Sequence, residues 1–438
     1  MKATRDPQSG YCSETKTFHS LRPIVPLPPE SLPLSFPSFA LSLLRHSPPS
    51  PSTPAFIFTS SKSIPKSLSF PDFLSLSNSL SASLRLRLRL SKGDVAFLLS
   101  PLRLEIPVLS FSLLHIGAVL SPSNPLSSPS DISRQIRLSR PKIAFATSST
   151  AASLPPDLPV VLIDSDHFRS MFIGGGGGSE DPPPIEVIRQ SDTAAILFSS
   201  GTTGRSKAAA IPHRSYIAMV AGFRDPAAEA AEVTMLLAPL FHTMGLFLFL
   251  KGVALGETAV MAAAERFEVG AVATAVAEHG VTVLAAAPTV LVALERAAAE
   301  EGIVVGLVSL RRAFVGGAPL SREAAERFAR RFPHVRIEQV PPMELELILQ
   351  SLPQISDAAV IPYPHEEVGQ IPMAYVVRKP GSHIDEATVM EFVATQVAPY
   401  KKIRRVAFVD SIPKSPTGKI LRRELVSHAI SASSASKL

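Results

Sequence analysis

The sequence contains little of several residue types, and each shortage excludes a class of protein. Cys12 is the only cysteine in 438 residues, and tryptophan is absent. A single thiol forms neither an internal disulfide nor a thiolate metal site, and a reducing intracellular compartment fits this composition. Aromatic residues make up only 6% of the chain and the basic residues are spread along it, so the net charge of +6 does not indicate a nucleic-acid surface.

Long apolar runs are also missing. The longest uncharged stretches run from Ile106 to Leu126, which polar residues interrupt, and from Met235 to Leu250, which is too short to span a bilayer comfortably. The first seventeen residues are polar and carry charges of both signs, which does not fit a secretory signal. We therefore expect a soluble globular protein without a transmembrane segment. Its hydrophobic content of 46% is enough for two or three structural units with buried cores.

The composition changes along the chain and divides it into four parts. Residues 1–92 are rich in Ser, Pro and Leu and contain a Leu/Arg alternation from Leu84 to Leu90. Two interpretations are open for this part, an organelle transit peptide or a diverged beginning of the domain that follows. We favour the second, because the stretch continues directly into a strand pattern after Lys92.

Residues 93–339 alternate short β-branched runs with helical patterns, which predicts a large α/β lobe of several layers. Residues 340–430 change to a helix, a strand pair, a helix and a strand, which predicts a small α+β lobe. Residues 431–438 form a polar tail that ends in Ser436-Lys437-Leu438, the signal read by the peroxisomal import receptor at a free C-terminus. We therefore expect a peroxisomal location.

The segment from Ser199 to Lys207 predicts a phosphate-binding loop. It combines hydroxyls, glycines and one lysine in a turn that follows the apolar run from Ala194 to Phe198. Glycines let backbone N–H groups point at an anion, and the hydroxyls and the ammonium add donors and charge. The spacing is not that of a Walker A motif, because Lys207 precedes Ala208 rather than Ser or Thr. The alternative interpretation is an ordinary polar surface loop.

A second lysine-bearing turn extends from Pro413 to Ile420 and precedes a helical pattern. Alone it is compatible with a plain basic turn. Together with the first loop and with Pro212-His213-Arg214-Ser215, it resembles the motifs of the adenylate-forming ligases, the superfamily of acyl-CoA synthetases, luciferases and nonribosomal adenylation domains. From about Val95 to Leu425, the chain is most similar to the plant 4-coumarate:CoA ligase-like group.

This resemblance implies an acyl-CoA synthetase-like fold, with a large multi-layer α/β lobe followed by a small α+β lobe. It also implies an acid-thiol ligase that uses ATP, Mg²⁺ and coenzyme A. A small carboxylic acid reacts with ATP to give an acyl-adenylate and pyrophosphate, and coenzyme A then forms the thioester. A luciferase-like mono-oxygenase shares these motifs, but the small lobe argues against it and no oxygen-handling signature is present.

The resemblance further implies roles for individual residues. Lys419 stabilises the charge that develops on the α-phosphate, and His242 lies beside the acyl pocket, although a lone histidine near an apolar run is more often structural. The expected ATP and coenzyme A contacts are Ser199, Ser200, Gly201, Thr202, Thr203, Gly204, Lys207, Gln339 and Arg266. The expected acyl-pocket residues are His242, Met244, Gly316, Gly317 and Ala318. No residue is assigned as a metal ligand.

One family motif is missing. Phe332 to Gln339 resembles the approach to a Tyr-Gly-x-Thr-Glu motif, but the pattern of the small lobe begins at once, between Gln339 and Pro341. The absent stretch includes the family's Thr and Glu near adenylate and Mg²⁺, its ribose-binding Asp and the hinge between the lobes. We therefore expect impaired activity. The alternative is a catalytically dead isoform that binds a nucleotide or acyl group, or an incomplete gene model.

Overall fold

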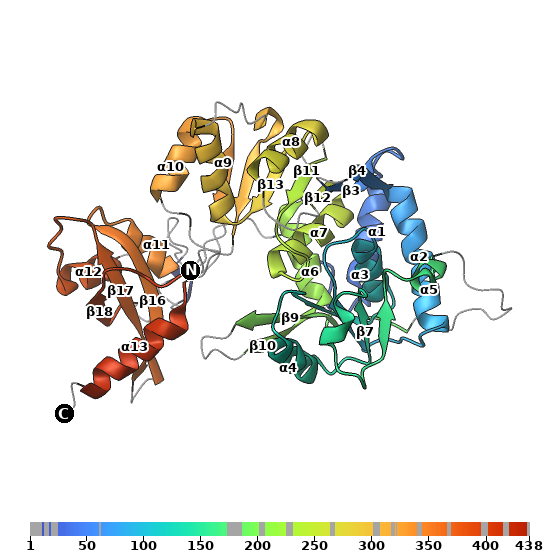
Figure 1. Cartoon of the computed structure of the whole chain (residues 1–438), viewed down its shortest axis with the longest axis horizontal. Helices are drawn as coiled ribbons and strands as arrows, with labels where there is room; N and C mark the ends of the chain where they lie inside the picture. The colour runs from blue at the N-terminus through green and yellow to red at the C-terminus, as the bar shows by residue number, and fades with distance from the viewer. Residues whose placement is uncertain are drawn as a thin grey trace, which may run out of the picture.

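The structure is a computed structural model of the chain (Figure 1). Two lobes follow each other along the sequence, and the small lobe lies at the left of the view. The structure describes residues 11–12, 17–18, 25–60, 63–172, 186–200, 206–224, 231–262, 268–300, 307–316, 320, 322–339, 344–365, 369–395, 402–414 and 420–435.

The large lobe contains a seven-stranded sheet with the order β15-β14-β13-β11-β12-β3-β4. Neighbouring strands are parallel except for the antiparallel pair β3 and β4. The strands are β3 (Pro54–Ser60), β4 (Ser63–Ser69), β11 (Val233–Leu236), β12 (Thr258–Ala262), β13 (Val283–Ala286), β14 (Arg312–Val315) and β15 (Arg336–Gln339).

A second, six-stranded sheet has the order β10-β9-β6-β5-β7-β8. Its strands are parallel except for the antiparallel pair β9 and β10. They are β5 (Val95–Leu99), β6 (Val119–Ser123), β7 (Ile143–Ala146), β8 (Val160–Leu162), β9 (Thr193–Ser200) and β10 (Ser206–Pro212). A short pair, β1 (Tyr11–Cys12) and β2 (Thr17–Phe18), precedes both sheets.

Five helices form a layer between the two sheets (Figure 1). They are α1 (Phe36–His46), α2 (Phe70–Leu86), α3 (Glu105–His115), α6 (His213–Phe223) and α7 (Thr243–Leu255). Phe56 of one sheet and Phe145 of the other both bury their side chains in this layer. Because alternate residues of a strand face opposite sides, each sheet also has an outer apolar face that needs its own cover.

The outer faces are covered by further helices, so the large lobe has five layers. Val260 and Leu284 of the seven-stranded sheet pack in an outer core with α8 (Val269–His279), α9 (Pro288–Glu300) and α10 (Arg322–Arg331). Phe97 and Ala144 of the six-stranded sheet pack with Ile132 of α4 (Pro129–Ser139). Three short helical segments, η1 (Ala151–Ser153), α5 (Asp166–Ser170) and η2 (Leu307–Ser309), lie in connections.

The small lobe is built on a three-stranded sheet, β16-β17-β18, which apolar cores cover on both faces. Its elements are α11 (Glu344–Gln350), β16 (Ile355–His365), β17 (Gly369–Arg378), α12 (Glu386–Ala394), β18 (Arg405–Phe408) and α13 (Arg422–Ala435). The predicted fold class, a multi-layer α/β lobe followed by a small α+β lobe, is confirmed. Within the described ranges, no helix is both long and apolar enough to cross a membrane.

A buried histidine ties the segment before α1 to the start of α6. The backbone N–H of Phe36 donates to Nδ1 of His213 over 3.1 Å, so the neutral imidazole carries its proton on Nε2. Next to it, the Arg214 guanidinium donates to the carbonyl of Pro28 over 3.1 Å. Burial lowers the pKa of His213 to about 4, although the Asp192 carboxylate opposes this shift. The side chain therefore stays neutral inside the fold.

We predict that His213 makes the stability of the large lobe depend on pH. Below pH ~6.5 an unfolded chain binds a proton at this side chain that the folded chain does not bind, so stability falls as the pH falls. Between pH ~7 and ~5, the free energy of unfolding falls by about 2 kcal/mol for this reason. Urea unfolding at several pH values measures this loss. The curve of His213→Asn should be flatter by this amount, and parallel curves for the two proteins would contradict the prediction.

Candidate functional site

The expected phosphate-binding loop is carried by a β-hairpin. In the antiparallel pair β9 and β10, Ser199 lies opposite Lys207 and Ser200 lies opposite Ser206. The strands therefore reach further into the motif than the sequence predicts, because Ser199, Ser200 and Lys207 belong to strands rather than to the turn. Lys207 is exposed. The expected contacts Gly201, Thr202, Thr203 and Gly204 lie outside the described residues.

This hairpin has a defined place in its sheet. β9 pairs in parallel with β6, so its carboxyl end lies at the same edge as the carboxyl ends of β5, β6, β7 and β8. In α/β sheets, ligands bind at this edge, because helix N-termini and loops converge there. β9 therefore ends, at Ser200, at the edge of the sheet where a ligand is expected.

The predicted acyl-pocket residues His242 and Met244 lie at the start of α7. His242 is the N-cap residue, is exposed, and donates its backbone N–H to the carbonyl of Pro239 over 2.9 Å. Met244 is partly buried and packs against the helical layer between the sheets. Since α7 follows β11, both residues lie at the carboxyl edge of the seven-stranded sheet.

Gly245 is the residue that lets α7 begin so close to the preceding loop. A side-chain Cβ at this position would overlap the backbone carbonyl oxygens of Pro239 and Ala238. Backbone atoms do not move aside as a flexible side chain does, so this contact requires glycine. The close contact fixes the first turn of α7, which carries Met244.

Gly316 lies at the same edge of the sheet. It follows β14 directly, is buried, and donates its N–H to the carbonyl of Ala286 over 3.2 Å. The next strand ends with Gln339, which pairs with Val315. The structure thus brings His242, Met244, Gly316 and the backbone of Gln339 to one edge.

Other expected residues are not placed. Gly317, Ala318, Arg266 and Lys419 lie outside the described residues.

An aromatic cluster beside Gly316 is not predicted from the sequence. The ring centroids of Phe223 at the end of α6 and Phe247 of α7 are 5.3 Å apart, and Phe223 lies 5.9 Å from Phe314 of β14. Phe223 is 36% exposed, as is Met219 one helical turn earlier. The only local signal is Phe314 between Ala313 and Val315, which indicates a large side chain on the inner face but does not identify its neighbours.

The residues on either side of the undescribed segment 415–419 make defined contacts. Lys414 forms an isolated antiparallel bridge with Ile420, and the Lys414 ammonium lies 2.5 Å from the Asp357 carboxylate. After this bridge, α13 begins with Arg422, whose guanidinium contacts both carboxylate oxygens of Glu346 at 2.7 and 2.8 Å. Glu346 is 1% exposed and also accepts the N–H of Val360 over 2.8 Å. Burial raises the pKa of Glu346, and the Val360 N–H and the Arg422 charge oppose this shift.

The described residues contain no group of three or more His, Cys, Asp or Glu side chains arranged to hold a metal ion.

A large lobe of two layered sheets followed by a small three-stranded lobe is the arrangement expected of an adenylate-forming enzyme. The chain belongs to the AMP-binding enzyme family, whose pattern it matches over residues 45–340. Residues 344–419 match the AMP-binding enzyme C-terminal domain. By family it is an ATP-dependent acid-thiol ligase.

Its relatives include plant CoA ligases. The chain is 41% identical to 4-coumarate--CoA ligase-like 5 of Oryza sativa subsp. japonica over 537 residues, covering 99% of this chain and 97% of the relative. It is 31% identical to Peroxisomal OPC-8:0-CoA ligase 1 of Arabidopsis thaliana, covering 98% of this chain and 100% of the relative.

Solved structures with this fold include the Mycobacterium tuberculosis fatty acyl CoA synthetase. Its TM-score is 0.65 at 17% identity, and the match covers 91% of this chain and 99% of that chain. ATP-bound MatB from Rhodopseudomonas palustris has a TM-score of 0.61 at 18% identity, and the match covers 90% of this chain and 99% of the MatB chain.

The chain matches its rice relative from end to end but is shorter. The alignment with this relative spans 537 positions, whereas this chain has 438 residues. At least 99 positions of the alignment, 537 minus 438, therefore have no counterpart in this chain.

We predict that Gly245→Ala destabilises the large lobe, because the added Cβ forces α7 away from the carbonyls of residues 238 and 239. The expected loss is about 1–3 kcal/mol, typical of overpacking. Gly270→Ala in α8 is the matched control, since a Cβ there meets nothing within 4 Å. It should be neutral or stabilising by up to ~1 kcal/mol. Urea unfolding compares them, and equal stability of the two variants would contradict a close backbone contact at Gly245.

Proposed function

We propose that the chain is a carboxylate-CoA ligase that activates an aromatic or fatty acid in two steps. A carboxylate oxygen of the acid attacks the α-phosphorus of ATP, and the bond to the β-phosphate bridging oxygen breaks, which gives acyl-adenylate and pyrophosphate. The sulfur of coenzyme A then attacks the acyl carbon, and AMP leaves. The observation that carries this proposal is the hairpin that places Lys207 opposite Ser199, in a chain 41% identical to a 4-coumarate--CoA ligase-like protein over 99% of its length.

In this proposal, the hairpin binds the β- and γ-phosphates. The Lys207 ammonium supplies a positive charge, while Ser199, Ser200, Thr202 and Thr203 supply hydroxyl donors. Backbone N–H groups at Gly201 and Gly204 add donors that need no side chain. Lys419 neutralises the charge that develops on the α-phosphate as the carboxylate attacks.

The acyl group is expected at the carboxyl edge of the seven-stranded sheet. His242 caps α7 and Met244 lies in its first turn at this edge, and Gly316, Gly317 and Ala318 provide small residues against which a ligand can lie. The neighbouring rings of Phe223, Phe247 and Phe314 support an acid with an apolar tail. We assign Arg266 to coenzyme A and Gln339 to the nucleotide on the resemblance alone.

Mg²⁺ is proposed as a companion of the ATP phosphates, which it neutralises when bound. Because the described residues form no acidic cluster for it, no step of the reaction is assigned to a protein-bound ion.

We also propose that the missing segment impairs this activity. The at least 99 positions without a counterpart are enough to contain the absent Tyr-Gly-x-Thr-Glu motif and the ribose-binding Asp. Without them, a site that binds triphosphate has fewer groups to orient it. The alternative function is a protein that binds a nucleotide or acyl group without turnover, or a chain read from an incomplete gene model.

The proposed location is the peroxisome. The sequence ends in Ser436-Lys437-Leu438, the form of a receptor-read peroxisomal signal. A relative at 31% identity, the Arabidopsis OPC-8:0-CoA ligase, is named as peroxisomal.

Carboxylate-dependent ATP–pyrophosphate exchange tests the proposed ligase activity. We predict measurable exchange with an apolar aromatic or fatty acid, and a loss of about 10²–10³-fold in Lys419→Ala, since one positioned electrostatic group contributes about this much. Lys379→Ala, which removes an exposed lysine of the same lobe, should retain the full rate.

Absence of exchange with every acid, together with retained ATP binding, would instead favour the inactive binding protein. An in-frame Tyr-Gly-x-Thr-Glu segment in the gene between the codons for Gln339 and Val340 would identify an incomplete gene model.

A further inference from the structure

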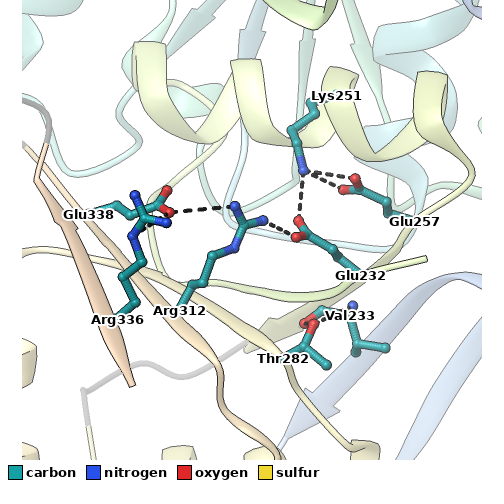
Figure 2. A network of polar contacts seen from close by, with 8 residues as sticks. All are labelled: Glu232, Val233, Lys251, Glu257, Thr282, Arg312, Arg336 and Glu338. Carbon is teal, nitrogen blue, oxygen red and sulfur yellow. Dashed lines mark hydrogen bonds and ion pairs between the residues drawn. The ribbon is translucent and has the colours of Figure 1, made fainter. Parts of the chain in front are cut away.

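Six charged side chains form a neutral chain of alternating sign at the starts of the parallel strands (Figure 2). Their order is Arg336, Glu338, Arg312, Glu232, Lys251 and Glu257. The proposed function uses none of them. Glu232, Glu257, Arg312 and Arg336 lie at or directly before the starts of their strands, at the edge opposite to the predicted acyl pocket, and Glu338 is the third residue of β15.

This row of ion pairs, called the ionic chain below, is most buried at Lys251 and Glu257. The Lys251 ammonium lies 2.8 and 2.7 Å from the two carboxylate oxygens of Glu257 and 3.0 Å from Glu232. Glu232 also pairs with the Arg312 guanidinium, whose Nη1 lies 3.6 Å from a Glu338 oxygen. The side chains of Lys251 and Glu257 are 6% and 8% exposed, whereas Arg336 at the other end is 79% exposed. Burial raises the pKa of Glu257, and the Lys251 charge opposes the shift.

This ionic chain connects the elements that carry the expected acyl-pocket residues. Lys251 is on α7, about 13 Å along the helix axis from His242. Arg312 is the first residue of β14, which leads to Gly316. Because α7 connects two parallel strands, it runs back against them, and its last turns lie at the strand starts. The ionic chain thus holds α7 and β14 at the ends opposite to His242, Met244 and Gly316.

The apolar contacts of α7 are less directional than the hydrogen bonds of the strands beside it. Hydrogen bonds fix the register of β14 against β13 and of β11 against β12. In contrast, α7 has buried side chains along most of its length, from Gly245 to Ala254, and apolar contacts are not directional. A buried ion pair with well-defined partners is directional, but replacing it with apolar residues is often neutral for stability. Here the Glu232 carboxylate contacts both Lys251 of α7 and Arg312 of β14, so it gives the helix a directional contact with that strand.

We propose that Lys251 and Glu232 are positioning residues, which fix α7 along its axis against β14 and thereby set the spacing of His242 and Met244 from Gly316. The role of that spacing in acid binding rests on the proposed function, whereas the positioning itself does not. Gly245 holds the opposite end of the same helix through its contact with the loop before it.

The test replaces the buried pair with apolar residues, in the double variant Lys251→Met and Glu257→Leu of the full chain. Hydrogen exchange followed by mass spectrometry reports on residues 242–247 without any substrate. We expect exchange there to become at least about fivefold faster, while the urea midpoint of unfolding stays near that of the unmodified chain. Arg336→Ser is the matched control at the exposed end of the ionic chain and should leave residues 242–247 unchanged.

Faster exchange confined to residues near 251, 257 and 312 would show a purely local role and would overturn the proposal. If the double variant does not fold, the test uses Glu232→Gln, which interrupts the ionic chain at its middle. Faster hydrogen exchange at residues 242–247 is again expected.

In the ligase assay, the Michaelis constant for the acid should rise by about fivefold or more, with a smaller change in kcat. If the unmodified protein shows no pyrophosphate exchange, the proposed function is contradicted. The hydrogen-exchange result then still decides whether Lys251 and Glu232 position α7.

Discussion

Both sheets of the large lobe bury their inner faces against one shared layer of helices, and the rest of the lobe depends on this constraint. Phe56, Phe145 and Phe249 belong to the same apolar core although they come from two sheets and a helix. Apolar burial of about 25 cal/mol per Å² makes this layer the main source of stability. The same layer contains α7, whose first turn carries Met244. The packing that stabilises the fold therefore also shapes the wall of the predicted acyl pocket.

Local patterns in the sequence are sufficient to predict the general fold but not its long-range contacts. The alternation of β-branched and helical segments predicts the layered α/β lobe, and the change of pattern after Met343 predicts the α+β lobe, because each pattern reflects the period of one element. The Glu232 to Arg312 contact joins residues 80 positions apart, and Phe36 meets His213 across 177 positions. Neither pair has a periodic signal, so only the folded chain identifies them. The contacts among Phe223, Phe247 and Phe314 are missed for the same reason, because these residues are far apart in the sequence.

The small lobe combines its own core with a paired buried charge. The Glu346 carboxylate accepts hydrogen bonds from the Val360 N–H and the Arg422 guanidinium, so its buried charge is compensated rather than isolated. This set joins α11, β16 and α13, the first, second and last elements of the lobe. Together with the apolar cores on both faces of the sheet, it ties the elements of the small lobe to one another.

The same reasoning bears on the segment that we propose to be missing after Gln339. The sequence places the missing motif just after Gln339, the last residue of β15, which pairs only with β14 among the described residues. Removing elements beyond an edge strand leaves every other pairing of the parallel sheet in place, so the buried layers lose little. Catalytic groups are different, because they lie on loops at the strand ends and each has a specific task. Stability is spread over many apolar contacts, whereas adenylate formation depends on a few residues in one place, so a deletion at this edge affects the second far more than the first.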